Sequence, residues 1–241
     1  TITENAVMVP AVVAAQVLSP DTPETDAAEF TWSVLSGTYI TITGYTGTAD
    51  TVVIPSQIDG YTVEKISPDV FKSNKVLKTV ILPDTVVEIG DNAFTGCTSL
   101  KDIMFSQSLQ TICKQVFYGC KSLTAVKLPE SIVSIGEGTF RNCTMLASVT
   151  IPNTSCEFAS DPDLFSNSYD VYDTIVFGYE GSTADQFAQR YGYQIKYLKD
   201  AEDVTGTTVV SATTTVPETT TTTTETTSTT TETTTTTETT S

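Results

Sequence analysis

The chain has 241 residues, of which 29 are acidic and 12 are basic, and it contains no histidine. Its formal net charge of −17 argues against binding to nucleic acid or to an anionic membrane surface, because both need a basic footprint. The lack of histidine excludes Ser-His and Cys-His nucleophiles and removes the commonest metal ligand, and no apolar run reaches the roughly 18–20 residues of a membrane-spanning helix.

Residues 1–29 are interpreted as an N-terminal extension. Within them, residues 6–18 (AVMVPAVVAAQVL) are apolar, like the hydrophobic part of a secretion signal, but they lack a positively charged flank and Pro10 interrupts them. A signal-peptide remnant and a strand of the mature protein both remain open. Residues 19–29 have the composition of a loop or short linker.

Residues 30–62 are expected to form an N-terminal cap and the start of the first repeat. They carry the aromatic residues Trp32, Tyr39, Tyr45 and Tyr61 in addition to Phe30. Such a group is typical of a sugar-stacking platform, but it equally suits the closure of a hydrophobic core at its end, and we favour closure.

A 23-residue repeat dominates residues 63–173. Units begin at Thr79, Asp102, Ala125 and Ser148, and an earlier unit fits if five extra residues are allowed in SQIDGYT. The last unit degrades after Pro152, as expected at the end of a repeat array. The columns in register are Leu82, Phe105, Leu128 and Ile151; Ile89, Ile112, Ile135 and Phe158; Phe94, Phe117 and Phe140; Cys97, Cys120 and Cys143; and Leu100, Leu123 and Leu146.

Each unit predicts the same local structure. The segment xVxLP alternates apolar and polar residues and is a short strand stopped by proline. A second short extended segment follows, and then one turn of helix closed by Gly96, Gly119 or Asn142. One unit cannot bury its own apolar side, so about five units are expected to stack at the ~4.8 Å strand spacing around one core.

The repeat LPxSVxxIGxxAFxxCxSLxxV resembles the BspA-like leucine-rich repeat family. Residues 37–67 are similar to that family's N-terminal cap, and residues 174–199 to its closing strand, helix and strand. The resemblance implies an α/β repeat solenoid, strand-rich with short helical turns and a cap at each end. It also implies an extracellular or bacterial cell-surface protein.

Residues 200–241 hold seven acidic residues, no basic ones and long threonine runs. Such a composition cannot bury enough apolar surface to order itself, so we interpret this segment as a disordered Thr/Glu-rich linker. Linkers of this kind resemble those of multi-modular bacterial proteins, which leaves open whether a docking, anchoring or enzymatic module follows Ser241.

The cysteine column is predicted to be core. Side chains that recur every 23 residues point the same way and cannot surround a metal ion, and their parallel Cβ atoms would lie too far apart for disulfides. Burial would raise the thiol pKa values and keep the thiols inert. A bridge between Cys113 and Cys156, which lie outside the column, remains open.

Acidic residues provide no convincing catalytic pair. The candidates for paired carboxylates are Asp161, Asp163, Asp170, Asp173, Asp91 and Glu137. None lies among apolar residues that would raise a carboxyl pKa for acid catalysis. The segment SDPDLFSNSYD offers oxygen atoms for calcium without the order of an EF-hand loop. We therefore expect no enzyme activity, no cofactor and no structural metal.

The outward side of the first strand is the candidate binding surface. Stacked units would place the side chains there in one ribbon four strands wide, with Ile81 beside Met104. The ligand-binding residues predicted on this ribbon are Ile81, Asp102, Met104, Lys127 and Thr150.

The sequence thus predicts a non-catalytic extracellular interaction or adhesion module. It would bind a protein or a glycan as a monomeric module tethered to other domains. The alternative is a spacer that positions an enzyme or docking domain in a cellulosome-like assembly.

Overall fold

The computed structural model describes residues 22–167 and 173–199. The chain divides into a unit of residues 1–207 and a second of residues 208–241, and all described residues belong to the first. The apolar segment 6–18 and the Thr/Glu-rich segment 200–241 lie outside the described residues, so both interpretations stay predictions.

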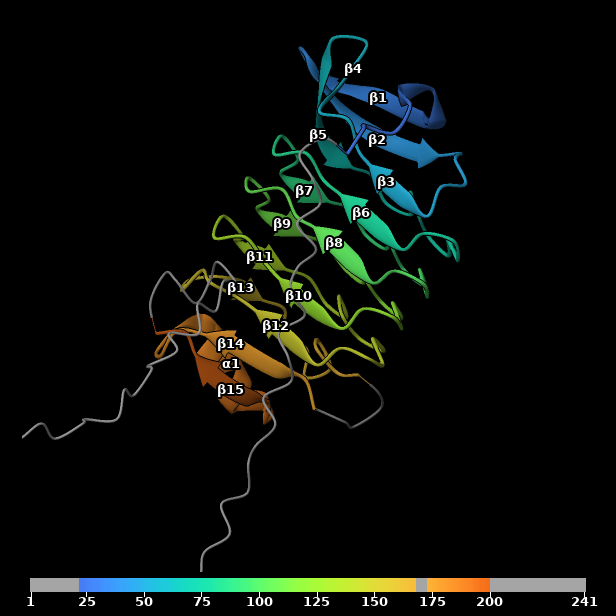
Figure 1. The fold of residues 1–241 in the computed structure, drawn as a ribbon. Coiled ribbons are helices and arrows are strands. Elements are labelled where there is room, and N and C mark those ends of the chain that lie inside the picture. The colour runs from blue at the N-terminus through green and yellow to red at the C-terminus, as the bar shows by residue number, and fades with distance from the viewer. Residues whose placement is uncertain (1–21, 168–172, 200–241) are drawn as a thin grey trace, which may run out of the picture. The chain divides into compact units, whose positions relative to one another are not determined.

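The N-terminal end is a hairpin that leads into the repeats (Figure 1). A short 3-10 helix at Ala27–Glu29 precedes β1 (Phe30–Ser36), which pairs antiparallel with β2 (Tyr39–Tyr45). β2 pairs parallel with β5 (Tyr61–Ile66). The five extra residues fall in the hairpin that β5 makes with β4 (Gln57–Ile58), which turns at Asp59 and Gly60 with positive φ angles of 52° and 82°.

The repeats stack as parallel strands with the predicted register. The first strands of the units are β3 (Thr51–Val53), β6 (Thr79–Ile81), β8 (Asp102–Met104), β10 (Ala125–Lys127) and β12 (Ser148–Thr150). The second strands are β7 (Glu88–Ile89), β9 (Thr111–Ile112), β11 (Ser134–Ile135) and β13 (Glu157–Phe158). Residues paired between neighbouring strands are 23 positions apart in the sequence. Between β3 and β6 they are 28 positions apart, because the first unit contains five extra residues.

The second strands form one continuous sheet, but the first strands do not. β1, β2, β5, β7, β9, β11 and β13 follow one another in an eight-stranded sheet that also includes β4. The first strands instead form two sheets, β3-β6-β8 and β10-β12-β14-β15. The predicted unbroken ribbon is therefore wrong at one place, between β8 and β10.

The interruption coincides with a unit whose first strand ends differently from those of its neighbours. Phe105 stands where neighbouring units have leucine or isoleucine, and Ser106 stands where they have proline. The larger Phe105 ring is buried and meets the Phe117 ring edge-on, with centroids 5.9 Å apart. We attribute the separation of β8 from β10 to the extra volume of this ring, because a close-packed core does not absorb added atoms without displacement.

The segment expected to be one turn of helix is instead a pair of turns. Four successive units each have two left-handed residues, four positions apart: Asp69 and Ser73, Asn92 and Gly96, Gln115 and Gly119, and Gly138 and Asn142. Gly96, Gly119 and Asn142 have φ angles of 70°, 69° and 61°, which confirms asparagine as the substitute for glycine. Asn92 and Gln115 are also left-handed, with φ angles of 58° and 52°. This earlier left-handed residue interrupts the run of right-handed residues that a helical turn needs.

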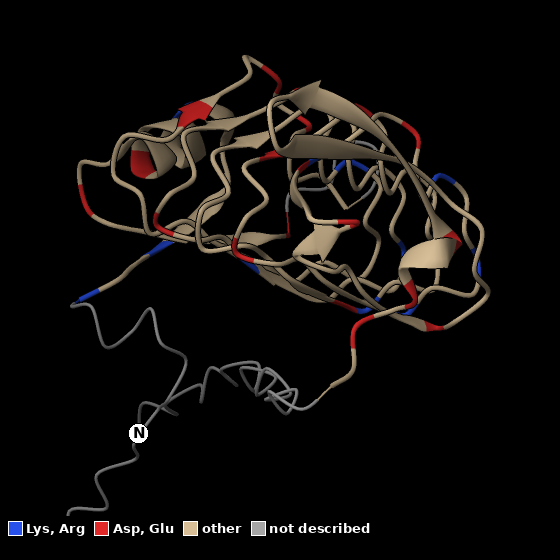
Figure 2. Ribbon diagram, turned by 90° about the horizontal axis from the view of Figure 1, so that it is seen from above, with Lys and Arg blue, Asp and Glu red and all other residues tan. Residues whose placement is uncertain are grey.

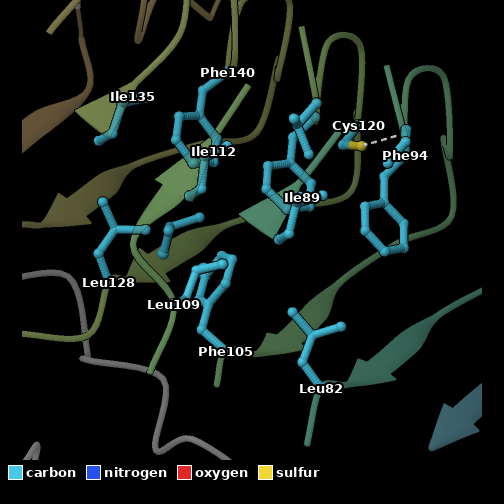
Figure 3. Close-up of a cluster of buried hydrophobic side chains, with 14 of the residues drawn as sticks. Leu82, Ile89, Phe94, Phe105, Leu109, Ile112, Cys120, Leu128, Ile135 and Phe140 are labelled. Carbon is cyan, nitrogen blue, oxygen red and sulfur yellow. Dashed lines mark hydrogen bonds between the residues drawn. The ribbon is translucent and has the colours of Figure 1, made fainter. Parts of the chain in front are cut away.

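A ladder of phenylalanine rings runs through the core (Figure 3). Phe71, Phe94 and Phe117 stack with centroids 4.9 and 5.4 Å apart, and Phe140 continues the stack at 5.3 Å. Phe165 extends it at 5.9 Å although it lies 25 residues after Phe140, so the 23-residue period did not reveal it. All five rings are buried.

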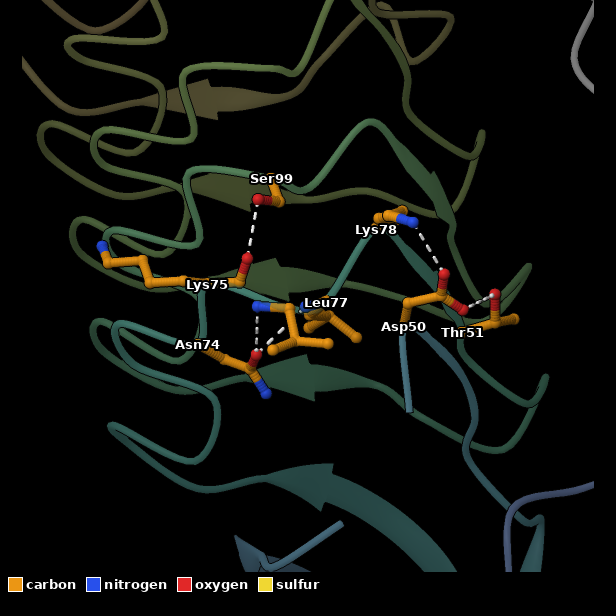
Figure 4. Close-up of polar contacts among 8 residues, drawn as sticks. Asp50, Thr51, Asn74, Lys75, Leu77, Lys78 and Ser99 are labelled. Atoms are coloured by element: carbon orange, nitrogen blue, oxygen red, sulfur yellow. Dashed lines mark hydrogen bonds and ion pairs between the residues drawn. The ribbon is translucent and has the colours of Figure 1, made fainter. Parts of the chain in front are cut away.

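Polar contacts also repeat from turn to turn (Figure 4). The Ser99 hydroxyl donates to the Lys75 carbonyl at 2.7 Å, and the Ser122 hydroxyl donates to the Thr98 carbonyl at 2.7 Å. In the first unit Asn74 stands at the position that cysteine occupies in the later units. Its side-chain oxygen accepts a hydrogen bond from the backbone N–H of Leu77 at 3.0 Å. It closes its own turn, whereas the cysteines fill the core.

The C-terminal end closes the array with β14 (Ile175–Gly178), α1 (Thr183–Tyr191) and β15 (Gln194–Tyr197). The side chain of Ser182 caps the start of α1 by accepting from the N–H of Asp185, and Gly192 ends the helix with a φ of 78°. The five-part division of the chain made from the sequence stays a prediction.

Candidate interaction surface

The outward side chains of the first strands β6, β8, β10 and β12 form the surface that we call the front face. Two residues of each strand contribute to it: Thr79, Ile81, Asp102, Met104, Ala125, Lys127, Ser148 and Thr150. Their inward neighbours Val80, Val126 and Val149 are buried, as the alternation predicts.

The five predicted site residues differ in exposure. Asp102, Met104 and Lys127 are exposed, and Met104 keeps 43% of its surface accessible. Ile81 and Thr150 are half-buried. Ile81 and Met104 are register partners on β6 and β8, so these two apolar side chains do lie next to each other.

The front face is interrupted beside Met104. β6 pairs with β8 and β10 pairs with β12 over three residues each, but no backbone hydrogen bond joins β8 to β10 in the described part of the chain. Ile103 is half-buried, whereas its equivalents in other units are buried. The β8 patch is defined as the outward Ile81 and Met104 together with Ile103, whose inward side chain packs against the core and is half-buried beside the interruption. Lys127 lies across the interruption, and partial burial lowers its pKa.

Sequence reasoning missed the C-terminal extension of this face. β14 pairs with β12 so that Phe177 lies beside Thr150, and β15 pairs with β14 so that Lys196 lies beside Phe177. The Lys196 ammonium lies over the Phe177 ring, 5.8 Å from its centroid. The alternating pattern of TIVFG would have indicated the outward Phe177 had the closing strand been aligned with the repeats.

The cysteine column is core, as predicted (Figure 3). Cys97, Cys120 and Cys143 are fully buried, and their thiols donate to the carbonyls of Phe71, Phe94 and Phe117 at 3.0, 3.3 and 3.1 Å. Burial raises the pKa of Cys97 to about 11 and that of Cys143 to about 12, and the pKa of Cys120 lies well above its usual value. These thiols are therefore neutral at physiological pH.

The two remaining cysteines do not form the bridge that the sequence left open. Cys113 and Cys156 are both free thiols. Burial is the main cause that raises the pKa of both, to about 12 for Cys156. Neither has the lowered pKa of a nucleophilic thiol.

Several of the acidic candidates have structural partners. Asp161 is buried and accepts from the backbone N–H of Gly138 at 2.7 Å, and Asp163 pairs with Arg141 at 2.8 Å. Asp91 accepts from the N–H of Lys114 at 2.9 Å. Carboxylates engaged in this way hold turns in place. Asp170 lies outside the described residues.

The cap aromatics mainly close the core. Trp32 packs on Tyr61 with centroids 5.4 Å apart, and Tyr45 packs on Phe71 at 5.2 Å. Tyr39 differs, because it is 44% exposed on the hairpin. The interpretation as end closure therefore holds for three of the four residues.

A shallow hollow beside α1 is a further feature that the sequence did not indicate. It is lined by Phe158, Phe187, Arg190 and Tyr191, among others, and a second open hollow adjoins it through Glu157 and Phe158. The guanidinium of Arg190 lies over the Tyr191 ring at 5.5 Å.

Charged residues are spread over loops and turns (Figure 2). Among the described residues, no three His, Cys, Asp or Glu side chains gather closely enough to hold a metal ion. No helix in the described ranges has the length and apolarity needed to cross a membrane.

The repeat identifies the family. The family model described as "BspA type leucine rich repeat region" matches residues 53–178 in six copies. The chain belongs to this family. The six copies agree with the predicted repeat solenoid and add a copy to the five units that the sequence suggested.

Several solved structures of bacterial leucine-rich repeat proteins resemble this family member. A leucine-rich repeat protein of T. pallidum is 30% identical with a TM-score of 0.53, covering 72% of this chain and 98% of that protein. One from Bacteroides capillosus is 27% identical with a TM-score of 0.47, covering 50% and 92%. A leucine-rich cell surface protein of Faecalibacterium prausnitzii is 25% identical with a TM-score of 0.42, covering 68% and 56%. No protein of curated function matches the chain.

Proposed function

We propose that this BspA-type repeat domain is a non-catalytic extracellular interaction module that binds its partner through the front face. The observation that carries the proposal is the β8 patch. It places an exposed methionine and two half-buried isoleucines at the one point where the described first strands lose their backbone pairing.

The chemistry of the patch suits a protein partner better than a glycan. Sugar sites are commonly built on open aromatic rings, whereas the ring of the extended front face, Phe177, is covered by Lys196. Methionine adapts its shape to apolar partners, and polar residues around an apolar centre are typical of protein interfaces. Asp102 and Lys127 supply opposite charges beside the patch and would orient the partner.

The location is part of the proposal. Membership of this family supports an extracellular position at the bacterial surface. The raised pKa values of the buried thiols and the structural partners of the acidic side chains support a non-catalytic role.

An array of surface proteins and glycans probed with the whole chain tests the proposal. Met104→Asp and Ile81→Asp place a charge in the apolar patch, and each is expected to weaken binding by about tenfold or more, because a desolvated unpaired charge costs several kcal/mol. Val133→Asp is the matched control, since Val133 is 48% exposed but lies outside the front face.

Partner binding that survives both patch variants would contradict the front-face site. Loss of binding with Val133→Asp alone would place the site on the second-strand side. Detection of no partner on the array would favour the alternative spacer role.

A further inference from the structure

The N-terminal hairpin presents an open sheet edge. β1 stands at the end of the eight-stranded sheet and pairs only with β2 among the described strands. Its seven residues, FTWSVLS, leave one row of peptide groups without a strand partner there. In Figure 1, β1 lies at the N-terminal end of the stack.

The other sheet ends are short or covered in the described structure. The edge of β3 is met by the N-terminal segment, where the N–H of Thr25 donates to the carbonyl of Val53 at 2.9 Å. β13 packs against α1. β15 has four residues, one of which is Lys196, and charged side chains of this kind discourage pairing at an edge. β1 has neither a charged residue nor a proline.

Exposed apolar side chains gather on the same hairpin. Val34, Leu35 and Tyr39 are 53%, 41% and 44% exposed. The other large exposed apolar residues of the described chain are Met104 of the β8 patch and, in separate segments, Val76, Val133, Met145 and Tyr197. A long edge strand with exposed apolar side chains is the arrangement that proteins normally avoid unless another strand pairs with it.

The distribution of charge indicates which molecule supplies the strand that pairs with β1. Residues 30–45 contain no charged side chain, in a chain whose net charge is −17. Two copies of such an acidic chain repel each other over most of their surfaces, but this hairpin brings no like charges together. The neutral edge therefore suits a second copy of the chain.

We propose that β1 pairs antiparallel with β1 of a second copy, which joins the two eight-stranded sheets into one across a two-fold axis. In the register that places Ser33 opposite Ser33, Trp32 faces Val34 of the other copy. The irregular pairing of β1 at Leu35 limits the regular ladder to this central part of the strand. Aromatic and β-branched residues that face each other across strands stabilise the pair, and the two-fold repeats each contact. The interface does not involve the front face and leaves it open for a ligand.

The dimer is weak and reversible. One strand pair buries much less than the roughly 1,200–2,000 Å² of a stable interface, so association is expected only toward the upper micromolar range. Tethering of several copies at one surface would raise their effective concentration and favour pairing. This proposal departs from the monomeric module expected from the sequence.

Sedimentation velocity of the full chain from micromolar to millimolar concentration tests the pairing. The wild type is expected to shift from monomer to dimer as its concentration rises. Val34→Lys places like charges near the two-fold axis and is expected to weaken association by more than about tenfold. Val76→Lys is the matched control, because Val76 is 51% exposed outside the hairpin, and it is expected to dimerise like the wild type.

A cross-link tests the register independently. With Ser33→Cys, the two new side chains lie opposite each other, where Cβ atoms are about 4.5–5.5 Å apart. This distance is within reach of a short thiol-reactive bifunctional maleimide, which is expected to link the copies. Val76→Cys is the control and should remain unlinked. A chain that stays monomeric at every concentration overturns the proposal, and so does a dimer that Val34→Lys leaves unchanged.

Discussion

Phe117→Ala is expected to lower the free energy of unfolding by about 3–5 kcal/mol, the usual cost of removing a buried phenylalanine. Phe117 is fully buried at the centre of the ring ladder, and it stacks on Phe94 and Phe140 at 5.4 and 5.3 Å. It also meets Phe105 edge-on. Its loss removes contacts from both neighbouring turns, and a core built from a regular stack has little freedom to collapse around the cavity.

Urea unfolding followed by far-UV circular dichroism measures this change. Met104→Ala is the control, because an exposed side chain is expected to change the free energy of unfolding by less than about 0.5 kcal/mol. The measurement also reports cooperativity, since turns that depend on their neighbours unfold together. A loss for Phe117→Ala as small as that for Met104→Ala would contradict the continuous core.

The second large effect is an alkaline loss of stability caused by the buried thiols. Four cysteines, Cys97, Cys120, Cys143 and Cys156, have folded-state pKa values raised above the ordinary 9.0 by burial. Below pH 9 both folded and unfolded thiols are protonated, so they add no pH dependence. Above pH 9 the unfolded chain loses these protons while the folded chain keeps them. The free energy of unfolding therefore falls as the pH rises toward the folded pKa values of about 11 and 12.

The expected size at pH 10 is about 1.4 kcal/mol for each of Cys97, Cys143 and Cys156, or about 4 kcal/mol together, and Cys120 acts in the same direction. Urea unfolding between pH 7 and pH 10 measures it in the wild type and in Cys143→Ala. The variant is less stable at every pH because of its cavity, so the comparison uses the decrease of the free energy of unfolding between pH 7 and pH 10. This decrease should be smaller in Cys143→Ala by the contribution of one thiol. Equal decreases would show that Cys143 is not buried as a neutral thiol.

Much of the fold follows from the sequence because stacked repeats convert periodicity directly into spatial position. The 23-residue period gave the strand register, the buried isoleucine, phenylalanine and cysteine columns, and the place of the insertion. These features depend on side-chain type at fixed intervals. No alternative register keeps every apolar column inside.

The features that the sequence did not predict arise where a residue changes the local backbone or packing but still fits the 23-residue repeat. Phe105 is apolar like the other residues of its column, so the sequence pattern did not predict the separation of β8 from β10. The left-handed Gln115 is a residue type that does not mark this conformation, and Asn92 marks it only weakly, so the sequence did not reveal the pair of turns. Phe165 rejoins the ladder after two extra residues. The repeat columns record only the residue type at a fixed spacing. They do not show how a larger side chain displaces a strand, which backbone conformation a residue adopts, or where a change of spacing still leads to the same place in the core.

The candidate site was predicted in outline only. Alternation placed Asp102, Met104 and Lys127 outside, and the structure exposes them. The half-buried state of Ile103 and the extension through Phe177 and Lys196 depend on strand pairing, which only the three-dimensional arrangement gives.

The most direct test of the front face compares two methionines in one protein. Met104 lies in the β8 patch, and Met145 is 59% exposed outside the front face. Peroxide oxidation of each, followed by mass spectrometry, is measured with and without the partner that the array identifies. The front-face account predicts that the partner slows oxidation of Met104 several-fold and leaves Met145 unchanged. An unchanged rate at Met104 in the saturated complex would contradict it.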